Sequence, residues 1–365
     1  MLAHETYMQR CLELAKLGMG NVAPNPMVGA VLVYNNRIIG EGYHQQYGKA
    51  HAEVNCINSV KEEDKYLIEK ATLYVSLEPC VHHGKTPPCA DLIIEKKIPN
   101  VIIACRDSYE EVNGRGIEKL KAAAVNITLG ILEKKALELN KRFFTFHTKH
   151  RPYIILKWAQ SNDEKIANAD RSRVFISNEE TKRLVHKWRS EEASILVGTN
   201  TALHDDPALT TRLWNGNNPV RLVIDKELKL PASLQLFDNK VKTIVFNNLK
   251  HQHEGNILYY QIKDEKDNKD EKDNIDQILK ALHHLKIQSI IVEGGEKLLQ
   301  SFIDKGIWDE ARIITNTELS IVNGINAPEL NNAELINEET IGNNITPDFA
   351  NLGAFFFHSF PLTTA

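Results

Sequence analysis

The sequence predicts two consecutive α/β domains, each built from strands that alternate with helices. Two observations predict this fold class. Short apolar runs with strand character alternate with stretches whose apolar residues recur at helical spacing, in both halves of the chain. The length of 365 residues is also sufficient for two domains of ordinary size. In the first domain, we expect helices on both faces of a mostly parallel sheet.

Composition and charge narrow the classes of function. The hydrophobic fraction of 42% and the charged fraction of 25% are those of an ordinary globular protein. The net charge of −4 gives no basic excess for nonspecific nucleic-acid binding, so we expect a small free substrate. No apolar run is long enough to cross a bilayer, and the N-terminus lacks the pattern of a secretory signal. We therefore expect a cytoplasmic protein with no nucleic-acid or membrane partner.

The first domain opens with a predicted helix over residues 4–17 and a hairpin around Asn35-Asn36. A helix at 50–60 and a strand at 72–76 then lead to the most informative motif. The remaining predicted elements are a helix at 90–97, a strand at 101–105, a helix at 116–123 and a strand at 125–129.

Residues 141–151 are rich in Lys, Arg and His, and the chain then breaks at Pro152. We interpret this stretch as the domain boundary, with domains at 1–147 and 151–365. Its three phenylalanines, Phe143, Phe144 and Phe146, favour a linker that is pinned to one or both domains over a flexible tether.

The second domain begins with the apolar stretch 153–159, which is typical of a strand buried on both faces. A helix at 178–190 follows, with Ser177 or Asn178 as its cap. Two segments without apolar pattern, the tandem hexapeptide at 263–274 and the polar stretch 322–347, are predicted to be loops. A charged docking segment is the alternative for the hexapeptide. Further strands are expected at 194–198, 220–224, 243–246, 257–262, 289–293, 310–314 and 353–360, and helices at 275–285 and from Gly295.

One constellation carries chemistry. His51 and Glu53 lie at the start of a predicted helix, Cys80 follows a strand, and Cys89 begins another helix. One imidazole and two thiolates are ligands that zinc prefers, and three protein ligands leave a fourth position for water. Glu53 is placed to move protons to and from that water. The His-x-Glu and Pro-Cys…Cys pattern is typical of zinc deaminases that act on nucleobases.

A structural zinc loop is the alternative, with His82 or His83 as a fourth ligand. Such a loop has no need of Glu53, so the catalytic interpretation is favoured. The other three cysteines, Cys11, Cys56 and Cys105, lie in apolar contexts and are predicted to be buried free thiols in a reducing compartment.

Together, these residues resemble the bifunctional deaminase/reductase family of riboflavin biosynthesis, over nearly the whole chain. The deaminase half carries Ala23-Pro24-Asn25-Pro26-Met27-Val28-Gly29, Gly42-Tyr43-His44, His51-Ala52-Glu53, Pro79-Cys80 and the run from His82 to Cys89. The reductase half carries Arg151-Pro152-Tyr153, Leu156-Lys157, Ser161, Asp163, Lys165-Ile166-Ala167, Leu196-Val197-Gly198, Thr201, Asp205-Asp206-Pro207, Leu209-Thr210, Arg212 and Glu293-Gly294-Gly295.

The resemblance implies a cytidine-deaminase-like α/β/α domain followed by a dihydrofolate-reductase-like α/β domain. It implies two cofactors, Zn²⁺ and NADPH, and a phosphorylated pyrimidine as substrate. The 2-amino group of 2,5-diamino-6-(5-phosphoribosylamino)pyrimidin-4(3H)-one would be replaced by oxygen, with release of ammonia. The ribosyl group of the resulting aminouracil would then be reduced to ribityl by NADPH.

The resemblance also implies site residues. The metal ligands would be His51, Cys80 and Cys89, with Glu53 as the catalytic acid and base; Asn25, His44, His82 and Lys85 would bind the first substrate. In the reductase, Ala159, Phe175, Thr201, Asp205, Gly294 and Gly295 would line the cofactor site, and Arg189, Leu209, Arg212 and Glu293 would contact the substrate. Asp205 is the candidate for a catalytic role near the sugar carbon that receives hydride.

Some residues depart from the family pattern. Val81 replaces a second Cys, Tyr109 stands where a substrate-binding Asn is expected, and Glu164 replaces a turn glycine. Phe175 stands where Trp is common, and Arg173 stands near a usual Ser. These departures affect the expected reductase contacts more than the zinc site.

Two other functions remain as alternatives. One is a deaminase of a nucleoside or a tRNA base with a repurposed second domain. The other is a zinc-stabilised sensor that binds NADPH or a pterin-like ligand. The net charge and Lys85 argue against the first, and Glu53 argues against the second. The sequence does not specify the oligomeric state, and a homo-oligomer is compatible with it.

Overall fold

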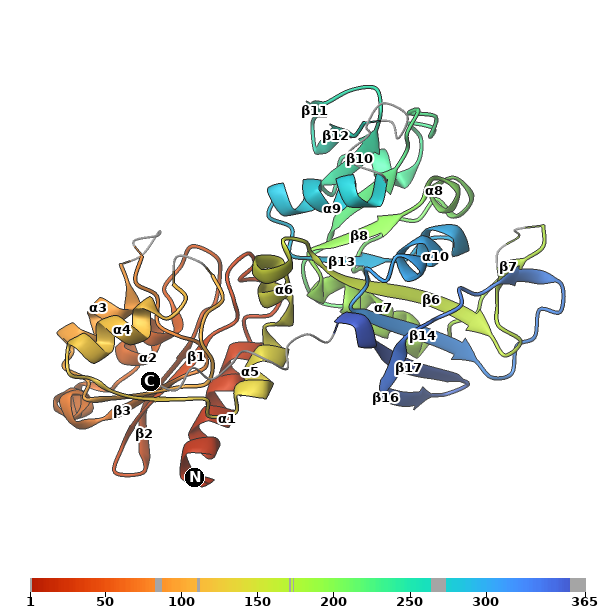
Figure 1. The fold of residues 1–365 in the computed structure, drawn as a ribbon. Coiled ribbons are helices and arrows are strands. Elements are labelled where there is room, and N and C mark those ends of the chain that lie inside the picture. Colours follow the sequence, from red (N-terminus) through yellow and green to blue (C-terminus); the bar gives the residue numbers. More distant parts are fainter. Residues whose placement is uncertain are drawn as a thin grey trace. The chain divides into compact units, whose positions relative to one another are not determined.

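The computed structural model describes residues 2–82, 87–109, 112–170, 172, 174–263 and 274–354. The chain divides into two compact units, Met1–Arg151 and Pro152–Ala365 (Figure 1). Each unit has its own sheet and its own hydrophobic core.

The sheet of the first unit has five strands in the order β2-β1-β3-β4-β5. β3 (Thr72–Val75), β4 (Asn100–Ile103) and β5 (Asn126–Leu129) are parallel to one another, whereas β1 (Gly29–Tyr34) is antiparallel to β3 and to β2 (Arg37–Tyr43). The sheet is thus mixed, and the prediction of a mostly parallel sheet was wrong for this half. The cause is the predicted hairpin, which reverses the chain through Asn35 and Asn36 at φ values of 47° and 62°.

Helices cover both faces of this sheet, as predicted. Gly29 lies against Cys11 of α1 (Leu2–Lys16), and Gly42, which pairs with the next residue of β1, lies against Asn55 of α2 (Ala52–Asn58). Since consecutive residues of a strand face opposite sides, α1 and α2 lie on opposite faces. α5 (Glu133–Leu139) packs beside α1, while α3 (Cys89–Glu95) and α4 (Arg115–Ala122) extend the layer of α2. A 3₁₀ helix, η1 (Glu62–Lys70), precedes β3.

Residues 141–151, which we expected to form a linker, mostly form helix α6 (Lys141–Lys149). Its three phenylalanines, Phe143, Phe144 and Phe146, are all buried. The helix ends at His150 in a left-handed conformation, two residues before Pro152. The basic and aromatic character that suggested a linker belongs to an amphipathic helix.

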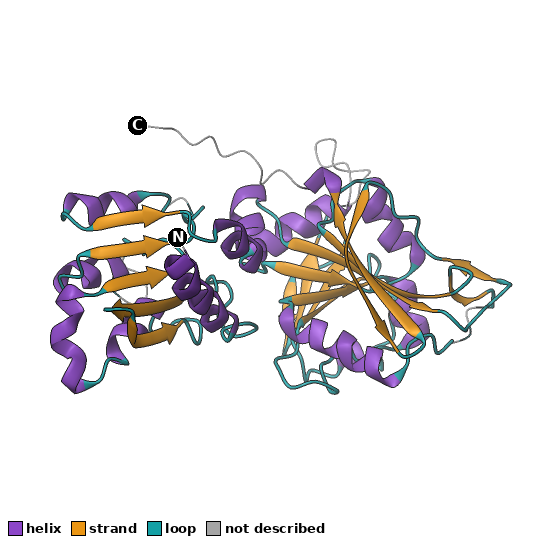
Figure 2. Cartoon of the chain, turned by 90° about the horizontal axis from the view of Figure 1, so that it is seen from below, coloured by secondary structure: helices purple, strands orange, loops and turns teal. Residues whose placement is uncertain are grey.

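The second unit is built on a ten-stranded sheet in the order β11-β12-β10-β9-β8-β13-β6-β14-β17-β16. Figure 2 shows this twisted sheet with helices packed against it. The seven strands from β12 to β14 in that order are parallel, and the three outer pairings are antiparallel. The strands are β6 (Tyr153–Ser161), β8 (Ser194–Val197), β9 (Val220–Ile224), β10 (Thr243–Asn247), β11 (Gln252–Glu254), β12 (Ile257–Gln261), β13 (Ser289–Val292), β14 (Glu310–Asn316), β16 (Ala333–Ile341) and β17 (Asn344–Asn351).

Two hydrophobic cores lie on the two faces of this sheet. Side chains alternate along β6, so that Ile154 and Leu156 join one core and Tyr153 and Ile155 the other. Helices α9 (Asn274–His284) and α10 (Glu296–Asp304) pack into the first core, and α7 (Glu179–Glu191) and α8 (Thr199–Asp205) into the second. The predicted cap of α7 is Asn178, whose side chain accepts a hydrogen bond from the Thr181 amide. A short 3₁₀ helix, η2 (Gln235–Phe237), also contributes to the second core.

The prediction of irregular structure at residues 322–347 was wrong. This stretch contains β15 (Gly324–Asn326), which pairs with β7 (Lys165–Asn168), all of β16 and the start of β17. β16 is an edge strand with mostly exposed side chains, so it has no apolar face to reveal it. In the neighbouring strand β17, the polar residue Asn344 is buried. Its side-chain oxygen accepts hydrogen bonds from Asn178 and Thr181, which compensate for the loss of contact with water.

Two further expectations concern segments that lie largely outside the described residues. The first two residues of the predicted strand 353–360 belong to the 3₁₀ helix η3 (Leu352–Ala354), and the others lie outside the described residues. Most of the tandem hexapeptide, residues 264–273, also lies outside them. Across the described ranges, no helix is both long and apolar enough to cross a membrane. Cys11, Cys56 and Cys105 are buried free thiols, as predicted.

Candidate active sites

In the first unit, three potential metal ligands meet at the end of β3. His51 caps the N-terminus of α2, Cys80 lies in the loop after β3, and Cys89 is the first residue of α3. The Nδ1 atom of His51 lies 3.5 Å from the Cys80 sulfur and 3.4 Å from the Cys89 sulfur. Usual zinc–nitrogen and zinc–sulfur bond lengths place the two atoms about 3.6 Å apart in a tetrahedral site. The three side chains therefore fit a zinc ion.

Hydrogen bonding prepares one of these thiols for metal binding. Interaction with Cys89, together with a smaller contribution from His51, lowers the pKa of the Cys80 thiol to about 4. The backbone amide of Cys89 donates to the same sulfur at 3.3 Å. The lowered pKa favours the thiolate, the form that binds metals.

Glu53 is the acidic side chain beside this cluster. It lies in the first turn of α2, two residues after His51, and is only 3% exposed. Burial, with a smaller contribution from Cys80, raises the pKa of its carboxyl group. A raised pKa brings a carboxyl group closer to the range in which it can both accept and donate a proton.

Asn25 and His44 lie together next to the cluster. The His44 ring packs edge-on against His51 with 5.3 Å between ring centroids, and its Nε2 atom lies 3.2 Å from the Asn25 amide nitrogen. The other ring nitrogen donates to the Ala50 carbonyl at 3.0 Å, which leaves Nε2 as the acceptor. Burial lowers the pKa of His44, so the ring is neutral. The structure thus brings both residues expected to hold the pyrimidine to the cluster.

The remaining residues of this site lie on two loops. His82 directly follows the Cys80 segment, and its Nδ1 atom is buried without a hydrogen-bond partner among the described residues. Its ring lies edge-on to Tyr109, with 5.9 Å between centroids. Lys85 lies outside the described residues.

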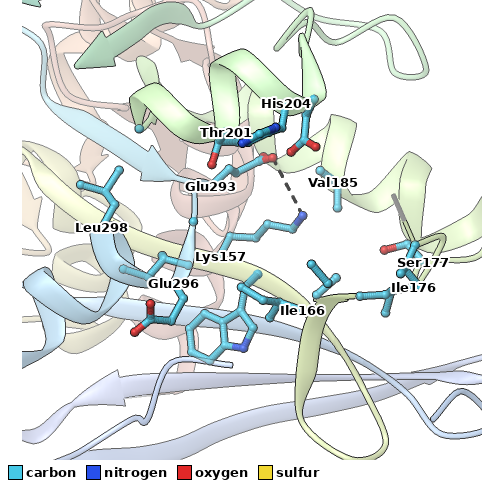
Figure 3. Close-up of a pocket in the computed structure, with 18 of the residues that line it drawn as sticks. Lys157, Ile166, Ile176, Ser177, Val185, Thr201, His204, Glu293, Glu296 and Leu298 are labelled. Atoms are coloured by element: carbon cyan, nitrogen blue, oxygen red, sulfur yellow. Dashed lines mark ion pairs between the residues drawn. The ribbon is translucent and has the colours of Figure 1, made fainter. Parts of the chain in front are cut away.

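In the second unit, a cavity of about 760 Å³ opens at the ends of β6, β8 and β13 (Figure 3). Most of the reductase residues implied by the resemblance line this cavity: Ala159, Phe175, Arg189, Thr201, Asp205, Arg212, Glu293 and Gly295. Leu209 and Gly294 do not line it. Leu209 is 2% exposed and belongs to the same hydrophobic core as Val185, which lines the cavity.

Gly294 lies where two strand ends meet closely. A Cβ atom at this position would come within 2.8 Å of the Gly198 amide nitrogen, so only glycine fits without a backbone shift. The next residue, Gly295, precedes α10 and lines the cavity together with Glu296 and Lys297. Figure 3 shows Glu296 and Thr201 around this opening. Backbone amides at the start of α10 are therefore available to a phosphate group in the cavity.

Three buried charged side chains in the cavity lining form a network of ion pairs. Arg189 donates to both carboxylate oxygens of Glu293, at 2.9 and 2.6 Å. Lys157 lies 3.9 Å from the same carboxylate, an ion pair that Figure 3 marks with a dashed line. Although burial opposes ionisation, Arg189 and Lys157 together lower the pKa of Glu293 to about 2. Lys157 was not among the predicted site residues. Its position inside the apolar run of β6 was the available signal, since a lysine there must find a buried partner.

The low pKa of Glu293 predicts an acid-sensitive second unit. The carboxylate stabilises the fold above its unfolded pKa near 4.5, and this contribution is lost as the pH falls towards 2. All four tryptophans, Trp158, Trp188, Trp214 and Trp308, lie in this unit, so tryptophan fluorescence reports its unfolding. We expect the unfolding temperature to fall more steeply between pH 5 and pH 2 in the wild type than in Glu293→Gln. Parallel curves would contradict this expectation.

Four of the five departures from the family pattern, Val81, Tyr109, Glu164 and Phe175, lie within the described residues. Glu164 adopts the left-handed conformation, with φ of 57°, in the turn between β6 and β7, and its amide donates to the Ser161 carbonyl at 3.0 Å. The turn therefore keeps the geometry that glycine favours, at a cost of about 1 kcal/mol. Phe175 is 70% exposed at the mouth of the cavity, where Lys182 lies over its ring. Arg173 lies outside the described residues.

Comparisons with known proteins agree with the sites described in both units. The family model of the cytidine and deoxycytidylate deaminase zinc-binding region matches residues 1–105, and that of the RibD C-terminal domain matches residues 152–318. The riboflavin biosynthesis protein RibD of Aquifex aeolicus is 40% identical over 306 residues, which cover 84% of each chain. That of Escherichia coli is 33% identical over 322 residues, covering 84% of this chain and 85% of the relative.

Solved structures give the same result. The diaminohydroxyphosphoribosylaminopyrimidine deaminase/5-amino-6-(5-phosphoribosylamino)uracil reductase of Thermotoga maritima superposes with a TM-score of 0.85 at 34% identity, covering 96% of this chain and 99% of that one. A RibD structure from Acinetobacter baumannii also gives a TM-score of 0.85, at 26% identity and the same coverage.

Proposed function

The chain belongs to the RibD family of bifunctional deaminase/reductases in riboflavin biosynthesis, and from that premise we propose which residues carry each reaction. The enzyme uses zinc for deamination and NADPH for reduction. We propose that its substrate is 2,5-diamino-6-(5-phosphoribosylamino)pyrimidin-4(3H)-one. The name of the Thermotoga protein, a diaminohydroxyphosphoribosylaminopyrimidine deaminase, supports this proposal. The product of the first reaction, an aminouracil, is the substrate of the second.

For the deaminase, His51, Cys80 and Cys89 would hold zinc, which when bound would supply an activated water molecule for attack on the ring carbon that bears the amino group. Glu53 would accept the first proton of the water and pass it to a ring nitrogen. It would then take the second proton from the hydroxyl group added to the ring carbon and deliver it to the amine, which leaves as ammonia while the carbonyl forms. Asn25 and His44 orient the pyrimidine, and His82 and Lys85 bind its polar edge or its phosphate. The observation that carries this proposal is the convergence of three zinc donors with a buried carboxyl group of raised pKa.

For the reductase, NADPH supplies hydride, and the protein holds both reactants in the cavity. The cofactor side consists of Ala159, Phe175, Thr201, Gly294 and Gly295. Gly294 allows the backbone before α10 to lie close to the backbone at Gly198. Asp205, at the end of α8 and on the cavity wall, is the candidate polar or acidic group near the sugar carbon that receives hydride.

The substrate side of the reductase consists of Arg189, Arg212 and Glu293, with Leu209 packed behind. Arg189 directs three N–H groups to Glu293 and to the Thr210 carbonyl. Its other two N–H groups have no partner among the described residues, which supports a role in holding the substrate phosphate. Arg212 lines the same cavity and adds a second positive charge.

We further propose that the deaminase occupies residues 1–147 and the reductase residues 151–365. The division of the chain between Arg151 and Pro152 supports this assignment. Five free cysteines favour a reducing compartment, and we propose the cytoplasm. The association of this chain into a homo-oligomer is also a proposal, which its mass in solution would test.

Zinc removal tests the separation of the two sites. Treatment with a chelator should abolish ammonia release from the diaminopyrimidine, because His51, Cys80 and Cys89 then hold no metal. NADPH oxidation with the aminouracil should persist, and added zinc should restore ammonia release. Ammonia release that survives complete removal of zinc would contradict the assigned ligands.

A further inference from the structure

The deaminase site contains a departure from its family for which the structure offers a function. Tyr109 occupies the position of an expected substrate-binding asparagine. Its ring lies between two histidines, edge-on to His82 at 5.9 Å and tilted against His147 of α6 at 4.9 Å. His147 in turn packs against Phe143 at 4.5 Å and Phe146 at 5.3 Å. These five side chains form a continuous aromatic column from α6 to His82, two residues after the proposed zinc ligand Cys80.

The backbone of Tyr109 is held firmly. Its amide donates to the Asp107 carboxylate at 2.8 Å, and its carbonyl accepts from Val112 at 2.8 Å and Asn113 at 3.0 Å. The amides of Asp107 and Gly114, on either side of this turn, both donate to the buried carboxylate of Glu78.

Glu78 lies two residues before Cys80 and also accepts from Gly116 and Ile117 at the start of α4. One buried carboxylate thus ties the Tyr109 turn to the segment that carries Cys80 and His82. These buried hydrogen bonds fix the backbone at Tyr109 relative to the segment that carries Cys80 and His82.

We propose that Tyr109 is a positioning residue of the deaminase, whose ring holds His82 in the orientation that binds the pyrimidine substrate. This inference rests on the proposed role of His82. The asparagine expected at this position would have contacted the substrate itself. In this chain, Tyr109 contributes to substrate binding indirectly, because its ring fixes His82, which contacts the substrate.

Two observations support this assignment. The Nδ1 atom of His82 is buried without a partner among the described residues, and a buried nitrogen without a partner is costly unless a ligand satisfies it. The edge-to-face arrangement also restricts rotation of the His82 ring, because turning it would break the favoured contact with Tyr109. On the other side, the Tyr109 ring packs against His147 of α6, which in turn lies against the buried Phe143 and Phe146.

The test is a double-mutant cycle on the full-length, zinc-loaded enzyme, with ammonia release from the diaminopyrimidine as the assay. Tyr109→Leu should raise the deaminase KM about five-fold with kcat nearly unchanged, and Tyr109→Phe should remain within about two-fold of wild type. A five-fold change equals about 1 kcal/mol, the size expected for one ring contact. In the His82→Ala background, Tyr109→Leu should have no further effect on KM.

Matched controls distinguish positioning from damage to the fold. Zinc content and NADPH oxidation with the aminouracil should be unchanged in every variant, and Tyr66→Leu, which removes an exposed ring of the same unit, should behave as wild type. If Tyr109→Leu fails to bind zinc, His147→Leu serves instead, because it removes the support behind the Tyr109 ring. Its increase in KM should also disappear in the His82→Ala background.

The outcomes separate this inference from the function on which it rests. If His82→Ala leaves KM unchanged, His82 does not bind the substrate, and both proposals fail. If His82→Ala raises KM but Tyr109→Leu does not, or if their effects simply add, His82 retains its role and only the positioning role of Tyr109 is overturned.

Discussion

Glu53→Gln lowers the deaminase kcat by about 10³-fold, the largest effect that we expect from a single substitution in the first unit. Glutamine fills the same volume at this 3% exposed position but cannot accept or deliver the protons that the reaction requires. The three zinc ligands are unchanged, so the metal content should match that of the wild type. The reductase should also be unaffected, because the described residues that line its cavity belong to the second unit.

The measurement is ammonia release at saturating diaminopyrimidine, together with the zinc content of each protein. Glu63→Gln removes an exposed carboxylate from the same unit and provides the matched control. A Glu53→Gln enzyme that retains zinc and more than a tenth of the wild-type kcat would show that another group transfers the protons.

Glu293→Gln should have the largest effect in the second unit. It leaves the buried charges of Lys157 and Arg189 without their shared carboxylate. Removing one partner from a buried ion pair costs about 3–5 kcal/mol of the free energy of unfolding. We therefore expect a clear fall in the unfolding temperature reported by tryptophan fluorescence. NADPH oxidation should also decrease about 100-fold or more, since Arg189 loses the contacts that orient it.

The control for this substitution is Glu254→Gln, which removes a carboxylate from the solvent-exposed pair with Lys250 in the same unit. Exposed pairs contribute little to stability, so its unfolding temperature should equal that of the wild type. Ammonia release by Glu293→Gln should also be unchanged. Equal unfolding temperatures for Glu293→Gln and Glu254→Gln would indicate that the buried network does not stabilise this unit.

The sequence was sufficient to predict the zinc site and most of the strands. His51, Cys80 and Cys89 have few alternative chemical roles at this spacing, and Glu53 distinguishes a catalytic site from a structural one. The parallel strands β6, β8 and β13 were predictable because strands buried on both faces are almost continuously apolar.

Features that depend on tertiary contacts were not predictable in the same way. β16 is exposed over most of its length, and its pairing with β17 provides the order that its side chains do not. α6 combines basic residues with buried phenylalanines, a composition that also suits a linker. The role of Lys157 depends on Glu293, which lies 136 positions further along the chain and meets it only in the folded sheet.

The central claim is that one chain carries out two successive reactions at separate sites. The most direct test follows ammonia release and NADPH absorbance together, with zinc-loaded enzyme and the diaminopyrimidine phosphate as the only pyrimidine supplied. We expect one NADPH to be oxidised for each ammonia released at completion. In Glu53→Gln, both signals should disappear, and supplying the aminouracil should restore NADPH oxidation alone. Ammonia release without NADPH oxidation would contradict the reductase assignment, and NADPH oxidation without ammonia release would contradict the order of the two reactions.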